Sequence, residues 1–285
     1  MLAPMTRSAD ISPLSVLLSR VDAVSDGAPP RDSLPCGFAS LDKILGGGFR
    51  RGDLIVLSGD VASGKSALAL AFAIRASVQG TRVAFLTAEM TVERVLERII
   101  AIEARAKIDD LRQGALDDET RATAGSVAIR LREHLPLIER IPRNSGIEAI
   151  DDVLEDPPIA DLVVVDSVGA LVRDEKASDE EIGIIVRGLK ELALERDIAM
   201  IVTAPVTAVT GRADRRPTLD DLGSNGAMKQ TADVILALHR EEMYDVSKDI
   251  AGATELLVRK NRNGPTGYVD LYFYAQWMRF EDMSE

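Results

Sequence analysis

Short apolar runs and longer amphipathic segments alternate along most of the chain. The apolar runs lie at 53–58, 82–87, 161–166, 198–204 and 232–238. Segments with a helical period separate most of them, at 66–79, 92–106 and 184–196. Strands buried on both faces read as continuous apolar runs, and parallel strands need crossover connections between them. The pattern therefore predicts an α/β fold: a mostly parallel twisted sheet with helices on both faces.

The C-terminal part of the chain predicts a β-hairpin with a basic turn. Apolar segments at 253–258 and 269–274 flank the stretch RKNRNGPTGY, in which Asn-Gly-Pro supplies the turn. We expect this hairpin to add antiparallel strands at one edge of the sheet. Its cations belong either to a solvated surface turn or to a functional cluster, and the pattern leaves both open. They are Arg259, Lys260 and Arg262.

Residues 1–36 form a leader before the domain expected over 37–285. The leader carries apolar residues at a spacing of three and four, which predicts an amphipathic helix. They are Ile11, Leu14, Leu17, Leu18 and Val21. The helix packs either on its own domain or on a neighbouring subunit, because the period shows only that some apolar partner exists. The stretch at 25–35, SDGAPPRDSLP, predicts a linker.

Composition narrows the class of protein. The chain has 285 residues, 46 % of them apolar, and a net charge of −12. No apolar run reaches the roughly 18 residues of a membrane span, and the N-terminus lacks a signal-like centre. A single cysteine, Cys36, fits a reducing cytoplasm and, with two histidines, argues against a structural zinc site. The acidic balance leaves any nucleic-acid contact to local basic patches.

Residues 59–66 read GDVASGKS and fit the phosphate-loop pattern Gly-x-x-x-x-Gly-Lys-Ser. Glycines allow backbone N–H groups to point at phosphate oxygens, Lys65 reaches the β- and γ-phosphates, and the Ser66 hydroxyl ligates Mg²⁺. An ordinary glycine-rich turn is the alternative, but the motif follows a strand and opens a helix, as phosphate binding requires. We therefore expect ATP and Mg²⁺ as cofactors. The binding residues are Gly59, Asp60, Val61, Ala62, Ser63, Gly64, Lys65 and Ser66.

Two carboxylates follow other predicted strands. Asp166 ends DLVVVD, which is typical of an acid that holds Mg²⁺, although a strand-ending aspartate can also cap a turn. Glu89 follows RVAFLT; if that strand lies beside the phosphate-loop strand, Glu89 shares its carboxyl edge and can act as a general base. A helix N-terminal glutamate is the alternative. By pattern alone, Arg98 is a surface cation.

Longer segments around these motifs resemble the C-terminal motor domain of bacterial replicative helicases of the DnaB type, which are RecA-like ATPases. The segments are 37–59, 86–101, 101–119, 215–242 and 259–267. The resemblance runs from about Gly37 to Asp282. It implies a RecA-like fold and ATP-driven action on single-stranded DNA by a ring of this chain, six copies being the expected number. A helicase loader or another replication protein is the candidate partner.

The resemblance also implies roles for single residues. In this family the ATP site lies between subunits, and a basic hairpin of one subunit reaches the nucleotide of the next. By motif position, Lys260 and Arg262 act in trans, with Arg262 as the arginine finger, whose planar cation suits the γ-phosphoryl charge. Glu89 becomes the catalytic base and Arg98 a γ-phosphate contact in cis. The leader helix resembles the family's linker helix, which docks on a neighbour.

The sequence departs from the family at several points. The leader is shorter than the family's additional N-terminal domain, which recruits primase. Pro205 stands where the family has a glutamine that senses the γ-phosphate and links hydrolysis to DNA; proline offers no side-chain hydrogen bond. The stretch VVVDSVGAL, at 163–171, is closer to the recombinase branch of RecA-like proteins.

The candidate DNA loops are weakly basic. The loop at 172–181 is mostly acidic, and each loop is either a DNA contact or a solvated surface. The basic candidates lie at 211–217 and 222–230: Arg212, Arg215, Arg216 and Lys229. Phosphate contacts from a ring would sum, so we expect weak, salt-sensitive binding of single-stranded DNA.

Taken together, the residues favour an ATP-dependent DNA helicase or translocase of the DnaB type. Two alternatives stay open. One is an ATP-binding, non-unwinding paralogue that assembles with or regulates another ring. The other is a recombinase-type (RadA-like) DNA-binding ATPase.

Overall fold

The computed structural model describes residues 13–27, 32–154, 159–173, 178–206, 212–223, 226–245 and 250–283. The chain divides into two units, 1–33 and 34–285. In the first unit, the predicted leader helix is present as α1 (Pro13–Ser25). Its apolar side chains at 14, 17, 18 and 21 are more than half exposed, and Ile11 lies outside the described residues. The surface that covers them stays a prediction.

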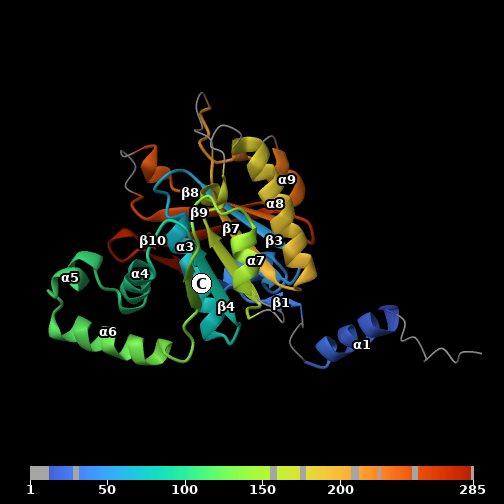
Figure 1. The fold of residues 1–285 in the computed structure, drawn as a ribbon. Coiled ribbons are helices and arrows are strands. Elements are labelled where there is room, and N and C mark those ends of the chain that lie inside the picture. The colour runs from blue at the N-terminus through green and yellow to red at the C-terminus, as the bar shows by residue number, and fades with distance from the viewer. Residues whose placement is uncertain are drawn as a thin grey trace, which may run out of the picture. The chain divides into compact units, whose positions relative to one another are not determined.

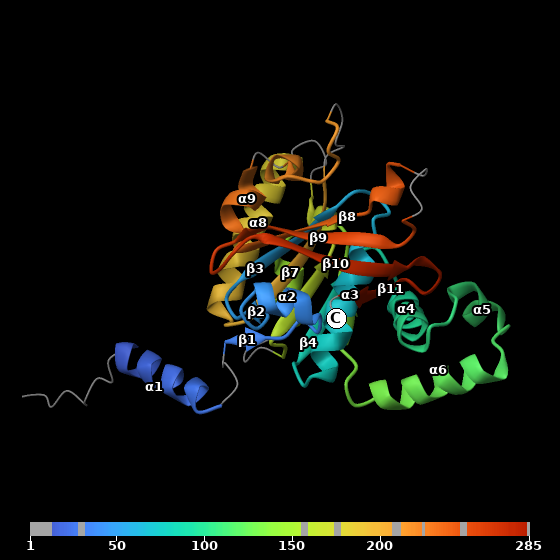
Figure 2. The same ribbon diagram turned by 180° about the vertical axis from the view of Figure 1, so that it is seen from behind.

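The second unit is built on a sheet of nine strands, in the order β11-β10-β9-β8-β3-β7-β6-β4-β5 (Figures 1 and 2). Six strands run parallel: β3 (Leu54–Gly59), β4 (Val83–Thr87), β5 (Leu137–Arg140), β6 (Leu162–Asp166), β7 (Ala199–Pro205) and β8 (Val234–His239). Three antiparallel strands extend the β8 side: β9 (Ala253–Asn261), β10 (Gly267–Tyr274) and β11 (Arg279–Asp282). The predicted α/β fold and edge hairpin are thereby confirmed.

Helices cover both faces of the sheet, because alternate side chains of the buried strands point to opposite cores. On one face Ile55 and Leu57 pack in a core with α2 (Ala39–Ile44), α3 (Lys65–Val78) and α4 (Val92–Ala104). On the other face Leu54 and Val56 belong to a core with α7 (Glu148–Leu154), α8 (Ser178–Glu195) and α9 (Ala227–Thr231). Figure 1 shows α7, α8 and α9 in front of the sheet. Figure 2, the view from the other side, shows α2 and α3 in front of the opposite face.

The sequence patterns missed several elements. Two helices lead from α4 to the edge strand β5: α5 (Ile108–Gln113) and α6 (Asp118–Leu131). Asp117 caps α6 by accepting a hydrogen bond from the Thr120 amide at 2.7 Å. Strand β5 was not expected, since none of its residues is fully buried. Also missed were α2, α7 and a small sheet of β1 (Ser33–Leu34) with β2 (Phe49–Arg50).

The expectation that the Glu89 strand lies beside the phosphate-loop strand is wrong. Strands β7 and β6 lie between β3 and β4. The carboxyl ends of these parallel strands nevertheless lie along one side of the sheet. Gly59 at the end of β3 pairs with Pro205, and Thr87 at the end of β4 pairs with Asp166. Glu89 therefore still lies on the same side of the sheet as the phosphate loop. Among the described residues, no helix is long and apolar enough to cross a membrane.

Candidate nucleotide site

The phosphate loop lies between β3 and α3, the context that its motif requires. Gly64 is the N-cap of α3 and has φ +105°, a conformation that favours glycine. A Cβ at this position would lie 3.0 Å from the Phe280 ring. Backbone and packing together therefore require a residue without a side chain at this point, and the N–H groups of the first turn of α3 are left facing the loop.

Lys65 folds back onto its own loop, where its Nζ donates a hydrogen bond to the Asp60 carbonyl at 2.7 Å. Burial lowers the pKa of this ammonium group, while Asp166, Asp60 and Glu89 act in the opposite direction. Three carboxylates around one lysine leave this site with a net negative charge. A phosphate can therefore bind there only together with a cation, as it does in a nucleotide bound with Mg²⁺.

Asp166 ends β6 and lies in the buried floor of the site, 2 % exposed. Its Oδ1 accepts hydrogen bonds from Ser66 Oγ at 3.1 Å and from Thr203 Oγ1 at 2.6 Å. Burial raises the pKa of this carboxyl, and the two hydroxyls oppose the shift. Its Oδ2 is buried and has no hydrogen-bond partner among the residues that the structure describes. A buried carboxylate oxygen without a partner, beside a serine hydroxyl, fits a hard divalent cation such as Mg²⁺.

Among the described residues, no group of three or more His, Cys, Asp and Glu side chains could hold a metal ion by itself. In nucleotide sites Mg²⁺ is usually bound by one or two protein oxygens together with phosphate oxygens. Ser66 and Asp166 are the residues that fit this role.

Glu89 and Arg98 border the same site. Glu89 follows β4 and is exposed; its Oε1 accepts a hydrogen bond from Ser167 Oγ at 2.8 Å. Arg98 lies on α4 and is half-buried, with its pKa lowered by burial and raised by the charge of Asp166. It therefore lies within electrostatic reach of Asp166. The structure brings together Lys65, Ser66, Glu89, Arg98 and Asp166.

The two hairpin cations lie at the amino ends of the parallel strands, whereas this site lies at their carboxyl ends. Arg262 Nε is 3.0 Å from Asp233 Oδ1, and Asp233 directly precedes β8. The Asp233 amide bonds the carbonyl of Leu54, the first residue of β3. The phosphate loop begins at the far end of β3, roughly 17 Å further along the strand. Lys260 Nζ donates to the carbonyls of Lys229 at 2.8 Å and Gln230 at 3.1 Å.

The candidate DNA cations are engaged with carboxylates. Arg212 pairs with Asp221 and Lys229 pairs with Asp220, each at 2.7 Å. Arg215 also has an interaction partner. Residues 174–177, 207–211 and 224–225 of the candidate loops lie outside the described residues. The cations that are described carry less free positive charge than the sequence suggests.

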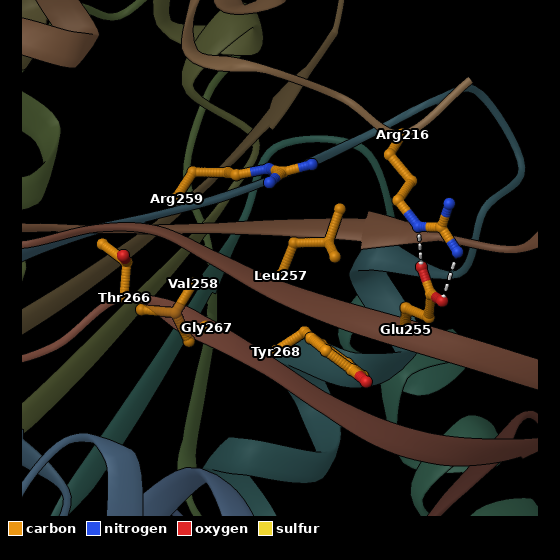
Figure 3. A pocket seen from close by; sticks show the side chains of 8 residues that line it. All are labelled: Arg216, Glu255, Leu257, Val258, Arg259, Thr266, Gly267 and Tyr268. Carbon is orange, nitrogen blue, oxygen red and sulfur yellow. Dashed lines mark hydrogen bonds and ion pairs between the residues drawn. The ribbon is translucent and has the colours of Figure 1, made fainter. Parts of the chain in front are cut away.

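Arg216 forms a two-point contact with Glu255, at 2.5 and 2.7 Å, on the exposed side of β9 (Figure 3). The pair borders a pocket of about 430 Å³ that also includes Arg259 and Tyr268. Arg259 Nε donates to the Pro217 carbonyl at 2.7 Å, so the guanidinium is held along the strand. This pocket lies on the antiparallel part of the sheet, away from the phosphate loop.

Pro205 ends β7 at the carboxyl edge, exposed and in register with Gly59. The position lies beside the phosphate loop, where the family resemblance implies a glutamine that senses the γ-phosphate. Proline at this position offers no side-chain hydrogen-bond donor.

The sequence patterns did not indicate three polar residues of the site: Thr203, Ser167 and Tyr244. Thr203 donates a hydrogen bond to Asp166, and Ser167 donates one to Glu89. The Tyr244 hydroxyl donates to Asp60 Oδ2 at 3.0 Å, and burial, with Asp60, raises its pKa to about 12. Thr203 and Ser167 could have been found, because both lie where apolar strands end.

A model of the DnaB-like helicase C-terminal domain family matches residues 33–282. The "Replicative DNA helicase DnaB" of Leifsonia xyli is 29 % identical over 95 % of this chain and 60 % of its own length. A "Probable plasmid replicative DNA helicase" of Chlamydia psittaci is 31 % identical over 89 % of this chain and 56 % of its own. The chain thus spans less than two thirds of these relatives. A solved DnaB-like replicative helicase, described with its interactions with primase, has the same fold, with a TM-score of 0.84 at 23 % identity over 98 % of this chain and 68 % of that one.

Proposed function

This chain belongs to the DnaB-like helicase C-terminal domain family, and on that premise we propose that it is an ATP-driven motor of a DNA helicase or translocase. It assembles as a ring on single-stranded DNA and hydrolyses ATP between subunits. Loaders or other replication proteins are its candidate partners. The names of the relatives and the geometry of the phosphate loop support this function.

The side chains of one subunit would bind and orient the nucleotide. The first turn of α3 and Lys65 would hold the phosphates. Ser66 and Asp166 would hold Mg²⁺, whose positive charge would offset the charge that develops on the phosphoryl oxygens. Glu89, exposed at the rim and oriented by Ser167, accepts a proton from the attacking water. Arg98 adds positive charge beside Asp166 on the same side.

One observation carries the proposal that two subunits complete the site. Within one chain, Arg262 lies at the amino ends of the parallel strands and the phosphate loop lies at their carboxyl ends, roughly 17 Å apart along β3. An arginine finger must touch the γ-phosphate to stabilise the transition state. Arg262 can do this only for the nucleotide of another subunit, so hydrolysis should require assembly.

Mixing inactive subunits tests the proposal. Lys65→Ala removes the phosphate-binding lysine, and Arg262→Ala removes the finger, so each variant alone should be inactive. In mixed assemblies, some interfaces combine an intact Lys65 with an intact Arg262, and part of the ATPase activity should return. Mixed rings verified by sedimentation velocity that show no return of activity would rule out the finger in trans.

A non-unwinding paralogue is the second candidate. Pro205 beside Gly59 and the ion pairs of Arg212 and Lys229 favour it, because both weaken the link between nucleotide and DNA. The two candidates share the hydrolysis site and differ in whether DNA changes the turnover rate.

A further inference from the structure

Asp233 is a buried carboxylate at the base of the hairpin, and its two oxygens have different partners. Oδ2 accepts a hydrogen bond from the Leu54 amide at 2.9 Å and from Lys190 Nζ at 2.6 Å. Oδ1 lies 3.0 Å from Arg262 Nε. The residue is 1 % exposed. The phosphate-loop strand and α8 therefore fix the carboxylate, and its free oxygen holds Arg262.

The backbone strengthens this hold. The Arg262 amide donates to the Asp233 carbonyl at 2.9 Å, so one residue binds both the main chain and the side chain of Arg262. Next to it, Asn263 Nδ2 donates to Asp53 Oδ2 at 3.3 Å. The turn that carries the finger is thus tied to the starts of β3 and β8.

The contact leaves the end of the guanidinium available. It is an ion pair at Nε, and among the described residues the Arg262 side chain donates no hydrogen bond. The side chain is 52 % exposed. An ion pair at Nε leaves the two terminal nitrogens as the fork that binds phosphate oxygens.

The charges of the cluster also suit a finger. A carboxylate paired with Arg262 alone would cancel its charge. Lys190, whose side chain is only 17 % exposed, shares the same carboxylate. Asp53 adds a second negative charge to this cluster, and Arg50 and Lys260 add two further positive charges, so cations outnumber carboxylates around Arg262. The finger is therefore held in place and still attracts an anion.

We propose that Asp233, neutralised by Lys190, is the positioning residue of the trans-acting finger: it presents the Arg262 fork to the nucleotide of the neighbouring subunit. The inference rests on the proposed function, because Arg262 must act on a neighbour for its orientation to matter. Asp233 itself touches no nucleotide. Its loss should lower kcat and leave KM for ATP within about twofold, since misplacement of a transition-state contact costs rate and not binding.

A mixing experiment separates positioning from general support of the fold. In mixtures of Lys65→Ala and Arg262→Ala chains, the Lys65→Ala chain supplies the finger and the Arg262→Ala chain supplies the phosphate loop. Asp233→Asn placed in the finger-supplying chain should lower the restored kcat by about ten- to a hundredfold. The same substitution in the other chain should leave it unchanged, because that chain's finger is already missing.

A matched control and a second variant protect the test against misfolding. Asp161→Asn removes another buried, ion-paired aspartate that precedes a parallel strand, far from Arg262 along the sheet; in the finger-supplying chain it should leave the restored kcat unchanged. Lys190→Met leaves the carboxylate in place but lets it cancel the finger's charge, so it should act like Asp233→Asn and only in the finger-supplying chain.

Equal losses from both placements, or no loss from the finger-supplying placement, would overturn the positioning role while the parent mixture still shows restored activity. A parent mixture without restored activity would overturn the proposed function, and the positioning role with it.

Discussion

Asp53 and Asp161 are buried aspartates at the same edge of the sheet, yet their pKa values shift in opposite directions. Burial, followed by the charge of Asp233, raises the pKa of Asp53 from 3.8 to about 6. Burial also acts to raise the pKa of Asp161, but hydrogen bonds from Arg82 and Arg51 outweigh it and hold that pKa at about 2. A neighbouring cation in contact, and not burial as such, decides the sign.

This difference predicts opposite effects of removing each charge. Between pH 3.8 and about 6 the folded state binds the Asp53 proton more tightly than the unfolded chain does, so its contribution to stability falls as the pH rises. Asp53→Asn should therefore increase the free energy of unfolding at pH 8, by at most about 3 kcal/mol, with no gain below pH 4. Urea unfolding at pH 4, 6 and 8 measures this.

Asp161→Asn is the control, with the reverse expectation. The depressed pKa stabilises the fold above pH 3.8 and loses that contribution as the pH falls towards 2. The variant should be less stable than the parent at pH 7 and approach it in acid. An Asp53→Asn chain that is destabilised at pH 8 to the same degree would contradict the assignment of Asp53.

Thr203 contacts Asp166, the carboxylate proposed to bind Mg²⁺. Its buried Oγ1 donates to Asp166 Oδ1 at 2.6 Å. Thr203→Val keeps the shape but removes the donor, so it should cost about 1–2 kcal/mol of stability. It should also raise the Mg²⁺ concentration for half-maximal ATPase by about ten- to a hundredfold. A Mg²⁺ titration measures the second effect. Thr254→Val, at a buried threonine that donates only to the Gly252 carbonyl, should leave the titration unchanged.

At the scale of elements, the sequence predicts those whose apolar pattern is unbroken. β3, β6, β7 and β8 are fully or almost fully buried runs, and their bounds differ from the expected segments by one or two residues. β5 has mostly exposed or half-exposed side chains, and α5 buries none of its residues, so neither carries the pattern. Periodicity reports burial, and elements at the margin of the core leave little trace of it.

The site divides in the same way. Lys65, Ser66 and Asp166 could be found because a motif and a strand end fix their positions along the chain. The partners of Arg262 could not: Asp233 lies 29 positions earlier and Lys190 lies 72 earlier, and only the strand order brings them together. Pairings across the sheet follow from three-dimensional packing, on which local patterns carry no information.

Strand β9 connects the finger to the helix that follows a candidate DNA loop. A register shift places Lys260 opposite Ile235 and Val258 opposite Leu236, so Arg259 is an extra residue in β9. Beyond this bulge, Lys260 binds the last carbonyls of α9. Lys260→Met leaves both carbonyls without that donor and should speed amide hydrogen exchange across 227–231 about three- to tenfold, a loss of about 1 kcal/mol. Lys43→Met, on α2, is the control, and unchanged exchange would contradict the contact.

At the scale of the whole molecule, the open question is whether hydrolysis responds to DNA despite Pro205. The contact between Lys260 and α9 offers a physical link that does not need a glutamine at that position. A neighbour's phosphate bound by Arg262 would act on β9 and, through the Lys260 contacts, on the end of α9 that includes Lys229. Coupling would then run from the nucleotide of one subunit to the DNA loop of the next.

The ATPase rate measured against single-stranded DNA concentration tests this link, with Lys65→Ala as the blank. We expect stimulation at about 50 mM salt that is lost by about 200 mM, because few phosphate contacts are available and each is screened. Asp220→Asn should strengthen the stimulation by freeing Lys229 from its 2.7 Å ion pair, and Lys229→Ala should weaken it. Both side chains are exposed, so neither change should affect the fold. Turnover that ignores DNA in all three proteins would favour the non-unwinding paralogue, whose ring would hydrolyse ATP without using it to move along a strand.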